Sequence, residues 1–487
     1  MKRLLISALI AGLPGMAMAD AKADEIAKLK AQLEALQSQM QQLQKAVDQA
    51  TAAKTTDTAE DGNAELKQRV AGMEMKVDKL TNDANEGPIA GLSVTGYIDP
   101  TYIYNRTGKS AGFQFVNHSG SYGYANSTFG DVYLDIKKTF GVGPMAPSAE
   151  ISIMPNRGSG NTLLDGGGKN GIINTAIINY PISDTTQLVA GLMNSFGGYE
   201  YQLSTQMNTI THGLLYDFSD PGSYVGAGFN WSHGSWATKF MIANEQYRTT
   251  PNSAMDSNGQ TRSNNTPTVT GRVDYTLTSN WDVGGSANVG RQALYAHQDA
   301  NGNADGTFGF QGGSSNPYSN YYFGELDATY TGTDSVYNAE LDYGRQKNAA
   351  WNGGDAVWWG FSLMAHQKWT SETFGRMGAT LRYDYLNNSK NGGGGGGIAL
   401  DAASGIDSVN GFGVPNSCLL NSSANGTDCN GVNRQSLTAA LLFYPSDQLT
   451  LKMEYRHDWA NGDVFQRTDG SYRKSNDVFA AQAVYSF

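Results

Sequence analysis

Apolar and polar residues alternate one by one along many long segments of this chain, from Gly91 to the carboxyl terminus. Successive side chains of a β-strand point to opposite faces, so each such segment would have one apolar and one polar face. A soluble β-sandwich also alternates, but these segments run about 8 to 15 residues, against about 5 to 6 for an ordinary strand. In many of them the charges fall on one face until the ends of the segment, as in Lys452, Glu454, Arg456 and Asp458. The pattern predicts an all-β, antiparallel transmembrane β-barrel, with lipid outside and water inside.

Sixteen segments alternate in this way, and the lengths of their connections predict the topology. Bacterial barrels join their strands by short periplasmic turns and longer external loops in turn. The connections here follow that rule if the first external loop is 105–126 and the third is 195–221. Another apolar segment, 206–218, would make the strand count odd, so we predict that 195–221 folds into the barrel instead. The predicted strands are residues 92–104, 127–140, 148–155, 172–182, 186–194, 222–232, 235–246, 267–277, 281–291, 320–331, 335–346, 356–369, 374–387, 434–444, 448–458 and 477–487.

The composition agrees with a barrel and disfavours other classes of protein. Only 16% of the 487 residues are charged, whereas glycine (59) and tyrosine (26) are abundant, and an ordinary soluble domain has about 25% charged residues. After residue 13 no apolar run is long enough to span a bilayer as a helix. The net charge of -11 argues against a nucleic-acid partner, which needs a basic patch.

Residues 1–19 are predicted to be a secretory signal peptide. Lys2 and Arg3 precede an apolar stretch from Leu4 to Leu13, and Ala17-Met18-Ala19 has the small residues of a cleavage site. Export places the chain in an oxidising compartment, where Cys418 and Cys429 are expected to form a disulfide across a small loop.

Residues 20–85 are predicted to form a periplasmic coiled coil ahead of the barrel, which would occupy 86–487. Apolar residues are spaced alternately by three and four, the a/d pattern of heptads. A single amphipathic helix packed on a domain is the alternative. The coil would hold the chains of an oligomer together or reach toward the peptidoglycan, and the pattern does not choose between dimer and trimer. The two seams are Ile26, Leu29, Leu33, Leu36, Met40, Leu43 and Val47, then Leu66, Val70, Met73, Val77 and Leu80.

Taken together, the signal peptide, the Gln-rich heptads, the sixteen strands and the final Tyr485-Ser-Phe487 resemble Gram-negative outer-membrane porins. The chain more narrowly resembles a poorly characterised proteobacterial family of barrel porins with an N-terminal periplasmic coiled coil. The segments that look like that family are 129–136, 195–199 and 214–218. The resemblance implies an outer-membrane location among lipid and lipopolysaccharide, a homotrimer, and a water-filled channel for small polar solutes or ions.

Strand parity predicts which charged residues face the water of the channel. Acids gather on 320–331 and 335–346, whereas bases gather on 374–387 and 448–458. The infolded connection adds only the acids Glu200, Asp217 and Asp220. In a porin, an acidic loop opposite a basic wall would set a field across the constriction. We expect Arg376, Arg382 and Arg456 at the narrowest section; the alternative is that such charges are merely solvated and paired across strands. The predicted pore-lining residues are Arg272, Glu325, Asp327, Glu340, Asp342, Arg376, Arg382, Lys452, Glu454 and Arg456.

No motif indicates an enzyme, a cofactor or a metal. The Asn301–Gly306 segment resembles the start of a calcium loop but has Gly312 where the final Glu is required. Six glycines at 392–397 lack the Lys-Ser/Thr that a phosphate loop needs. The histidines have no metal-ligand spacing, and no Ser-His-acid set is evident for a barrel lipase or protease. The alternative function is a plugged, structural or adhesive barrel that binds partners through its external loops.

Overall fold

The computed structural model describes residues 90–116, 129–155, 172–248, 253–256, 258–298, 303–390, 406–407, 411–424 and 426–487. The predicted signal peptide and coiled coil lie outside these residues, so both stay predictions.

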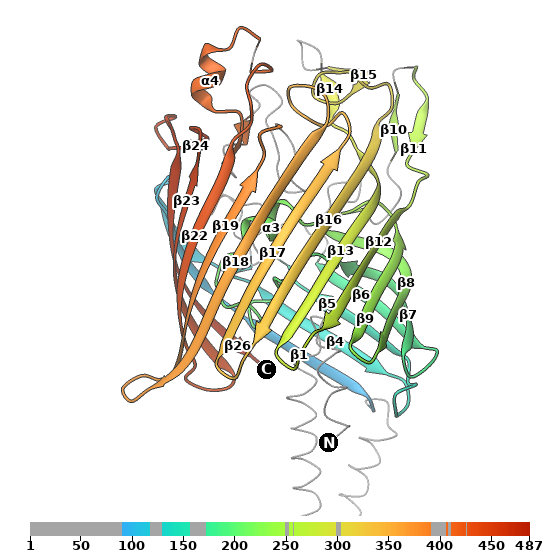
Figure 1. The fold of residues 1–487 in the computed structure, drawn as a ribbon, viewed down its shortest axis with the longest axis vertical. Coiled ribbons are helices and arrows are strands. Elements are labelled where there is room, and N and C mark those ends of the chain that lie inside the picture. The colour runs from blue at the N-terminus through green and yellow to red at the C-terminus, as the bar shows by residue number, and fades with distance from the viewer. Residues whose placement is uncertain are drawn as a thin grey trace, which may run out of the picture. The chain divides into compact units, whose positions relative to one another are not determined.

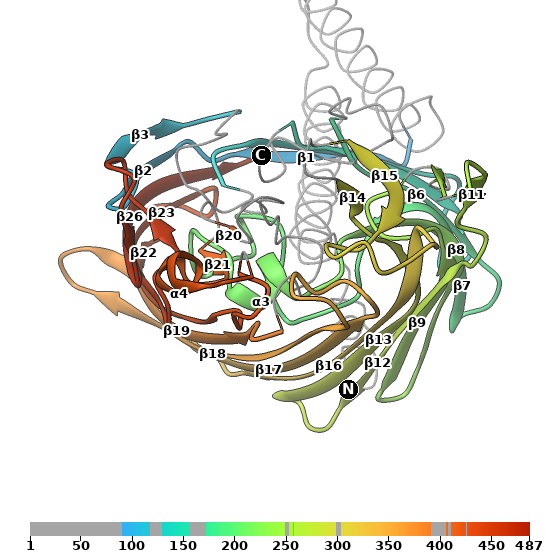
Figure 2. The same ribbon diagram turned by 90° about the horizontal axis from the view of Figure 1, so that it is seen from above.

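Eighteen strands form one closed sheet, and they occupy sixteen positions around a barrel (Figures 1 and 2). β1 and β2 share one position, since both pair with β26; β3 and β4 share the next, since they pair with β2 and β1. The pairing of β26 with β1 and β2 closes the ring. The barrel strands are β1 (Leu92–Ile98), β2 (Thr101–Asn105), β3 (Ser110–Gln114), β4 (Val132–Thr139), β5 (Ser148–Ile153), β6 (Ile173–Pro181), β7 (Thr186–Asn194), β8 (Ser223–His233), β9 (Trp236–Ala243), β12 (Thr268–Thr276), β13 (Trp281–Ala293), β16 (Tyr318–Thr331), β17 (Ser335–Gln346), β18 (Ala356–Ser371), β19 (Gly375–Asn387), β22 (Asn433–Phe443), β23 (Leu449–Ala460) and β26 (Ser475–Ser486).

The predicted sixteen-stranded antiparallel barrel is therefore confirmed, with one correction at its first hairpin. Residues 105–126 are not a long connection, because the chain turns at Arg106–Lys109 and returns at once as β3. The Asn105 side chain accepts hydrogen bonds from the backbone N–H groups of Thr107 (3.1 Å) and Gly108 (3.2 Å), which stabilises this turn. The predicted strand 127–140 corresponds to β4, which fills only one half of this barrel position, while β3 fills the other half.

Alternation along the strands produces an apolar outer surface. In β23 every second residue from Lys452 onward is buried, whereas those between are exposed or half-buried. Large apolar side chains stand outward on neighbouring strands, for example Leu326, Leu341, Leu363 and Leu381, each more than half exposed. A closed barrel leaves no unpaired strand edge, so its backbone is satisfied in lipid. This is the surface of an outer-membrane barrel.

The longer connections gather at one end of the barrel and carry small elements of their own (Figure 1). No helix among the described residues is long and apolar enough to cross a membrane. Segment 206–218 is not a strand, as predicted; its last five residues form the short helix α3. The elements are α3 (Leu214–Phe218), β10 (Ser253–Met255), β11 (Thr261–Ser263), β14 (Ala296–Gln298), β15 (Ala304–Phe308), β20 (Ile406–Asp407), β21 (Phe412–Gly413), α4 (Asn416–Asn421), β24 (Phe465–Gln466) and β25 (Tyr472–Arg473).

Candidate functional site

The connection between β7 and β8, here called the infolded loop (residues 195–222), lies inside the ring of strands (Figure 2). Ile210, Leu214, Leu215 and Phe218 are at most 1% exposed and belong to an apolar cluster inside the barrel. A loop in that position must satisfy its backbone groups by contacts with inward-facing wall side chains. The candidate site is the set of wall residues that make those contacts.

β23 holds the middle of the infolded loop through two adjacent inward positions. The Lys452 ammonium donates to the backbone carbonyls of Ser204, Met207 and Thr209, at 2.7, 2.8 and 3.0 Å. The Glu454 carboxylate accepts from the Ile210 backbone N–H (2.5 Å) and from the Thr211 hydroxyl (2.6 Å). Charged partners make stronger hydrogen bonds than neutral ones. Lys452 and Glu454 therefore bind mainly the backbone of the infolded loop, and Glu454 also binds the Thr211 side chain.

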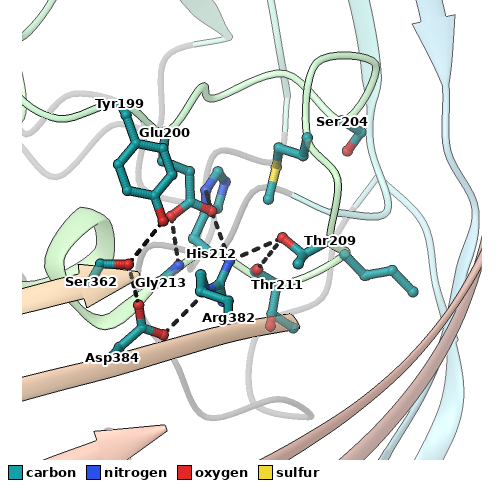
Figure 3. Close-up of polar contacts among 12 residues, drawn as sticks. Tyr199, Glu200, Ser204, Thr209, Thr211, His212, Gly213, Ser362, Arg382 and Asp384 are labelled. Carbon is teal, nitrogen blue, oxygen red and sulfur yellow. Dashed lines mark hydrogen bonds and ion pairs between the residues drawn. The ribbon is translucent and has the colours of Figure 1, made fainter. Parts of the chain in front are cut away.

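β19 holds the loop through Arg382, which is fully buried (Figure 3). Its guanidinium lies 3.1 Å from Glu200 Oε1, donates to Thr209 Oγ1 at 3.0 Å, and pairs with Asp384 of its own strand at 3.1 Å. The other oxygen of Glu200 accepts the Gly213 backbone N–H at 2.8 Å. Burial acts to raise the pKa of Glu200, but Arg382 and His212 outweigh it and hold the pKa below its ordinary value. Glu200 is thus a carboxylate within the loop.

Two further arginines connect the loop to the external end of the barrel. Arg456 donates to the His212 backbone carbonyl at 2.6 Å and pairs with Asp458 at 3.1 Å. Arg434 pairs with the same Asp458 at 3.0 Å, and its guanidinium lies between 5.1 and 5.5 Å from three phenylalanine ring centroids. Those rings come from three different connections, Phe218, Phe412 and Phe465. Arg434 is therefore the meeting point of the infolded loop and two external loops.

The neighbouring strands β16 and β17 carry a square of four acids on the inner face of the wall. Glu325 and Asp327 of β16 stand directly across from Asp342 and Glu340 of β17. Arg272 reaches them from β12, with its guanidinium 3.3 Å from Glu325 and 2.6 Å from Asp327. It can do so because Gly284 lies on the intervening strand, where a Cβ would come within 2.4 Å of the guanidinium. Arg272 thus forms ion pairs with two of the four acids of the square.

The remaining loop acids lie near different groups. Burial raises the pKa of Asp217 to about 6, although His212 and Arg456 act to lower it. Asp220 lies with Glu340 and Asp342, and both burial and the neighbouring carboxylates raise its pKa.

The loop acid Glu200 lies against the basic wall in direct contact with Arg382. One expectation about the site needs correction. Arg376 does not join Arg382 and Arg456, since its side chain is 55% exposed and pairs with Asp447 of a short turn. Parity identified which face these residues occupy, but their position along the barrel depends on how the loop folds.

Sequence reasoning missed Tyr199, Thr209, Thr211 and His212 as contact residues. The Tyr199 hydroxyl lies 2.8 Å from Ser362 Oγ, which in turn donates to Asp384 (Figure 3). These residues have no periodicity because they lie in an irregular segment. Only the apolar segment 206–218, which would make the strand count odd, marked this connection as unusual.

Cys418 and Cys429 form a disulfide that connects α4 to the segment after it. Its loop is short and lies in an external connection, so its entropic contribution is local, about 2 to 3 kcal/mol. We expect reduction with dithiothreitol to increase proteolysis of residues 416–432 while leaving the barrel's unfolding midpoint unchanged. A Cys418→Ser/Cys429→Ser variant should reproduce the effect, and a lowered barrel midpoint would contradict it.

Comparisons with known proteins found similar solved structures and one matching family. Similar solved structures include the anion-selective porin from Comamonas acidovorans (10% identity, TM-score 0.47, 81% of this chain and 99% of that one). Others are the channel DcaP of Acinetobacter baumannii (12%, 0.46, 81% and 97%) and OprB of Pseudomonas putida (8%, 0.47, 85% and 97%). No curated protein matches the chain. A family model described as "Protein of unknown function (DUF3138)" matches residues 1–59 and 52–487. The chain belongs to this DUF3138 family.

Proposed function

We propose that the barrel is an outer-membrane channel for passive diffusion of small hydrophilic solutes or ions, in which the infolded loop constricts the pore. The observation that carries the proposal is that inward side chains of β19 and β23 fix the loop inside the barrel. A barrel of about sixteen strands is wide enough to leave an aqueous passage. A loop fixed across that passage would set the size and charge of what passes. We expect no catalytic activity.

Single-channel recording tests this function. Purified full-length protein in a planar bilayer is expected to give discrete conductance steps, and candidate sugars, peptides and organic ions should block them in proportion to their size. A trimer, which we also propose, would produce steps in groups of three. Absence of any conductance by protein shown to be folded would contradict the channel.

The second candidate function is a plugged barrel that binds partners through its external loops. It is favoured by the apolar cluster inside the barrel, where Phe218, Phe412 and Phe465 surround Arg434. Absence of conductance in a planar bilayer, together with binding of a surface ligand by the external loops, would support the plugged barrel over the channel.

We expect weak cation preference if the channel conducts. Lys452, Arg382 and Arg456 are engaged by the infolded loop, whereas the square of acids on β16 and β17 has one neighbouring arginine, Arg272. The measurement is the reversal potential in a potassium chloride gradient. Clear anion selectivity would contradict this expectation.

Deleting residues 20–85 should leave a folded barrel whose oligomers dissociate more readily in mild detergent. The reason is that the predicted a/d seam associates helices between chains, while the barrel is closed without it. Size-exclusion chromatography with light scattering checks the oligomer. Unchanged oligomer stability would favour tethering to peptidoglycan instead.

A further inference from the structure

Three acids from two parts of the chain meet where the infolded loop ends against β17. Asp220 of the loop and Glu340 and Asp342 of β17 each offer a carboxylate oxygen, and these oxygens all lie within 4.8 Å of one another. The residues are 7%, 3% and 5% exposed. We call this group the carboxylate triad.

Among the described residues, no lysine, arginine or histidine forms an ion pair with the triad. None of the ion pairs found among the described residues includes Asp220, Glu340 or Asp342. Arg272 acts on Asp220 from a distance, but its own contacts are with Asp274, Glu325 and Asp327. Buried carboxylates are ordinarily paired, protonated or bound to a metal ion.

Several oxygens of the triad also lack hydrogen bonds. Both carboxylate oxygens of Asp342, Oδ1 of Asp220 and Oε1 of Glu340 are buried without a partner in hydrogen-bonding geometry. The same holds for the hydroxyl of Ser219, a fully buried residue beside Asp342. Unsatisfied buried oxygens of this kind are rare and call for an unseen partner, such as an ion. The unsatisfied hydroxyl of Ser219 is independent evidence for a bound ion, because Ser219 is not one of the acids of the triad.

The backbone of the infolded loop makes room for the triad. A Cβ at Gly198 would lie 2.7 Å from Asp220 Oδ2 and 3.2 Å from both Glu340 oxygens, and the φ angle there is +72°. A Cβ at Gly197 would lie 3.1 Å from Asp220 Oδ1. The pair of glycines thus keeps the space around the carboxylates free, and Tyr199 donates its backbone N–H to Glu340 Oε2 at 3.2 Å.

We propose that the carboxylate triad binds one divalent cation of the hard, oxygen-preferring class, with Ca²⁺ as the best fit. Carboxylate and hydroxyl oxygens suit Ca²⁺, Mg²⁺ or Mn²⁺. Ca²⁺ accepts irregular sets of oxygens at about 2.3 to 2.6 Å, whereas Mg²⁺ demands a near-octahedral set and keeps its waters. The ion joins the end of the infolded loop to β17, a part of the wall separate from Lys452 and Glu454 on β23. Glu340 and Asp342 are two residues apart on β17, but Asp220 lies about 120 residues before them, so no local motif predicts the set. This site goes beyond the channel function and does not depend on conduction.

Metal binding by the full-length protein tests the proposal. After dialysis against EDTA, the folded protein in detergent is titrated with CaCl₂ in a calorimeter, and with MgCl₂ in parallel. We expect about one Ca²⁺ per chain and weaker binding of Mg²⁺. Asp342→Asn and Glu340→Gln should each lower the Ca²⁺ affinity by about tenfold or more, since each removes one charged ligand. Asp220→Asn tests the same site from the loop, should a β17 variant not fold.

The matched control is Glu150→Gln, which removes an inward carboxylate of β5. Glu150 pairs with Lys137 and does not belong to the triad. It should bind Ca²⁺ as the wild type does. Each variant is first shown to be folded by its heat-dependent mobility in detergent gels. Absence of stoichiometric Ca²⁺ binding by the wild type would overturn the proposal, because the triad would then be held together by shared protons. Equal binding by wild type and all triad variants would overturn it as well, since the ion would lie elsewhere.

Discussion

Replacing Lys452 with methionine should free the infolded loop and increase the single-channel conductance roughly twofold or more. Lys452 is 2% exposed, and its ammonium donates to three carbonyls of the loop within 3.0 Å. Methionine has a similar length but cannot donate, so three buried carbonyls would lose their partner. We expect a loss of about 3 to 5 kcal/mol of loop attachment. The loop would then move away from β23 and widen the passage.

The control is Lys137→Met, which removes the same charge from an inward position of β4. Lys137 is 38% exposed, lies 3.7 Å from Glu150 and has no contact of this kind with the loop. It should alter the conductance far less. The measurement is the distribution of step sizes and the current noise of both variants in the same bilayer. Equal conductance of Lys452→Met and wild type would show that the loop does not constrict the channel.

Replacing Arg434 with methionine should lower the barrel's free energy of unfolding by about 3 kcal/mol. Arg434 and Asp458 are both fully buried and pair at 3.0 Å. The substitution removes the Arg434–Asp458 ion pair, although Asp458 still pairs with Arg456, and it removes the cation from the centre of three phenylalanine rings. A desolvated cation–π contact contributes up to about 2 kcal/mol. The two external loops and the infolded loop would then lose their common contact.

The control for this variant is Arg376→Met. Arg376 also pairs with an aspartate, Asp447, but the two side chains are 55% and 82% exposed. An exposed pair contributes about 0 to 1 kcal/mol, so this change should be nearly neutral. Urea unfolding of both variants in lipid vesicles, followed by tryptophan fluorescence, compares them. Similar losses for the two variants would contradict the structural role of Arg434.

The barrel could be predicted closely because lipid and water impose a period of two. β17 occupies 335–346 and β7 occupies 186–194, the ranges predicted from alternation. The prediction for the first hairpin was wrong because its turn depends on one side chain, Asn105. The hydrogen bonds of that side chain leave no periodic pattern in the sequence. The disulfide could be predicted because export implies an oxidising compartment and the chain has only two cysteines.

The site was predicted less completely. Parity placed Lys452, Glu454 and Arg382 on the inner face, and strand counting placed 195–221 inside the barrel. Neither argument could show that these three residues bind the infolded loop instead of facing open water. That outcome depends on the path of an irregular segment, which has no repeating pattern to read.

Local chemistry therefore determined the strands, because each residue's side of the sheet depends only on its parity and its preference for lipid or water. The contacts among residues inside the barrel, by contrast, depend on the tertiary structure. Glu200 meets Arg382 across 182 positions of the chain, and Thr211 meets Glu454 across 243. Closure of the barrel brings such residues together, and their charges then act over a few ångströms in a buried setting where water no longer screens them. The carboxylate triad is a product of the same closure.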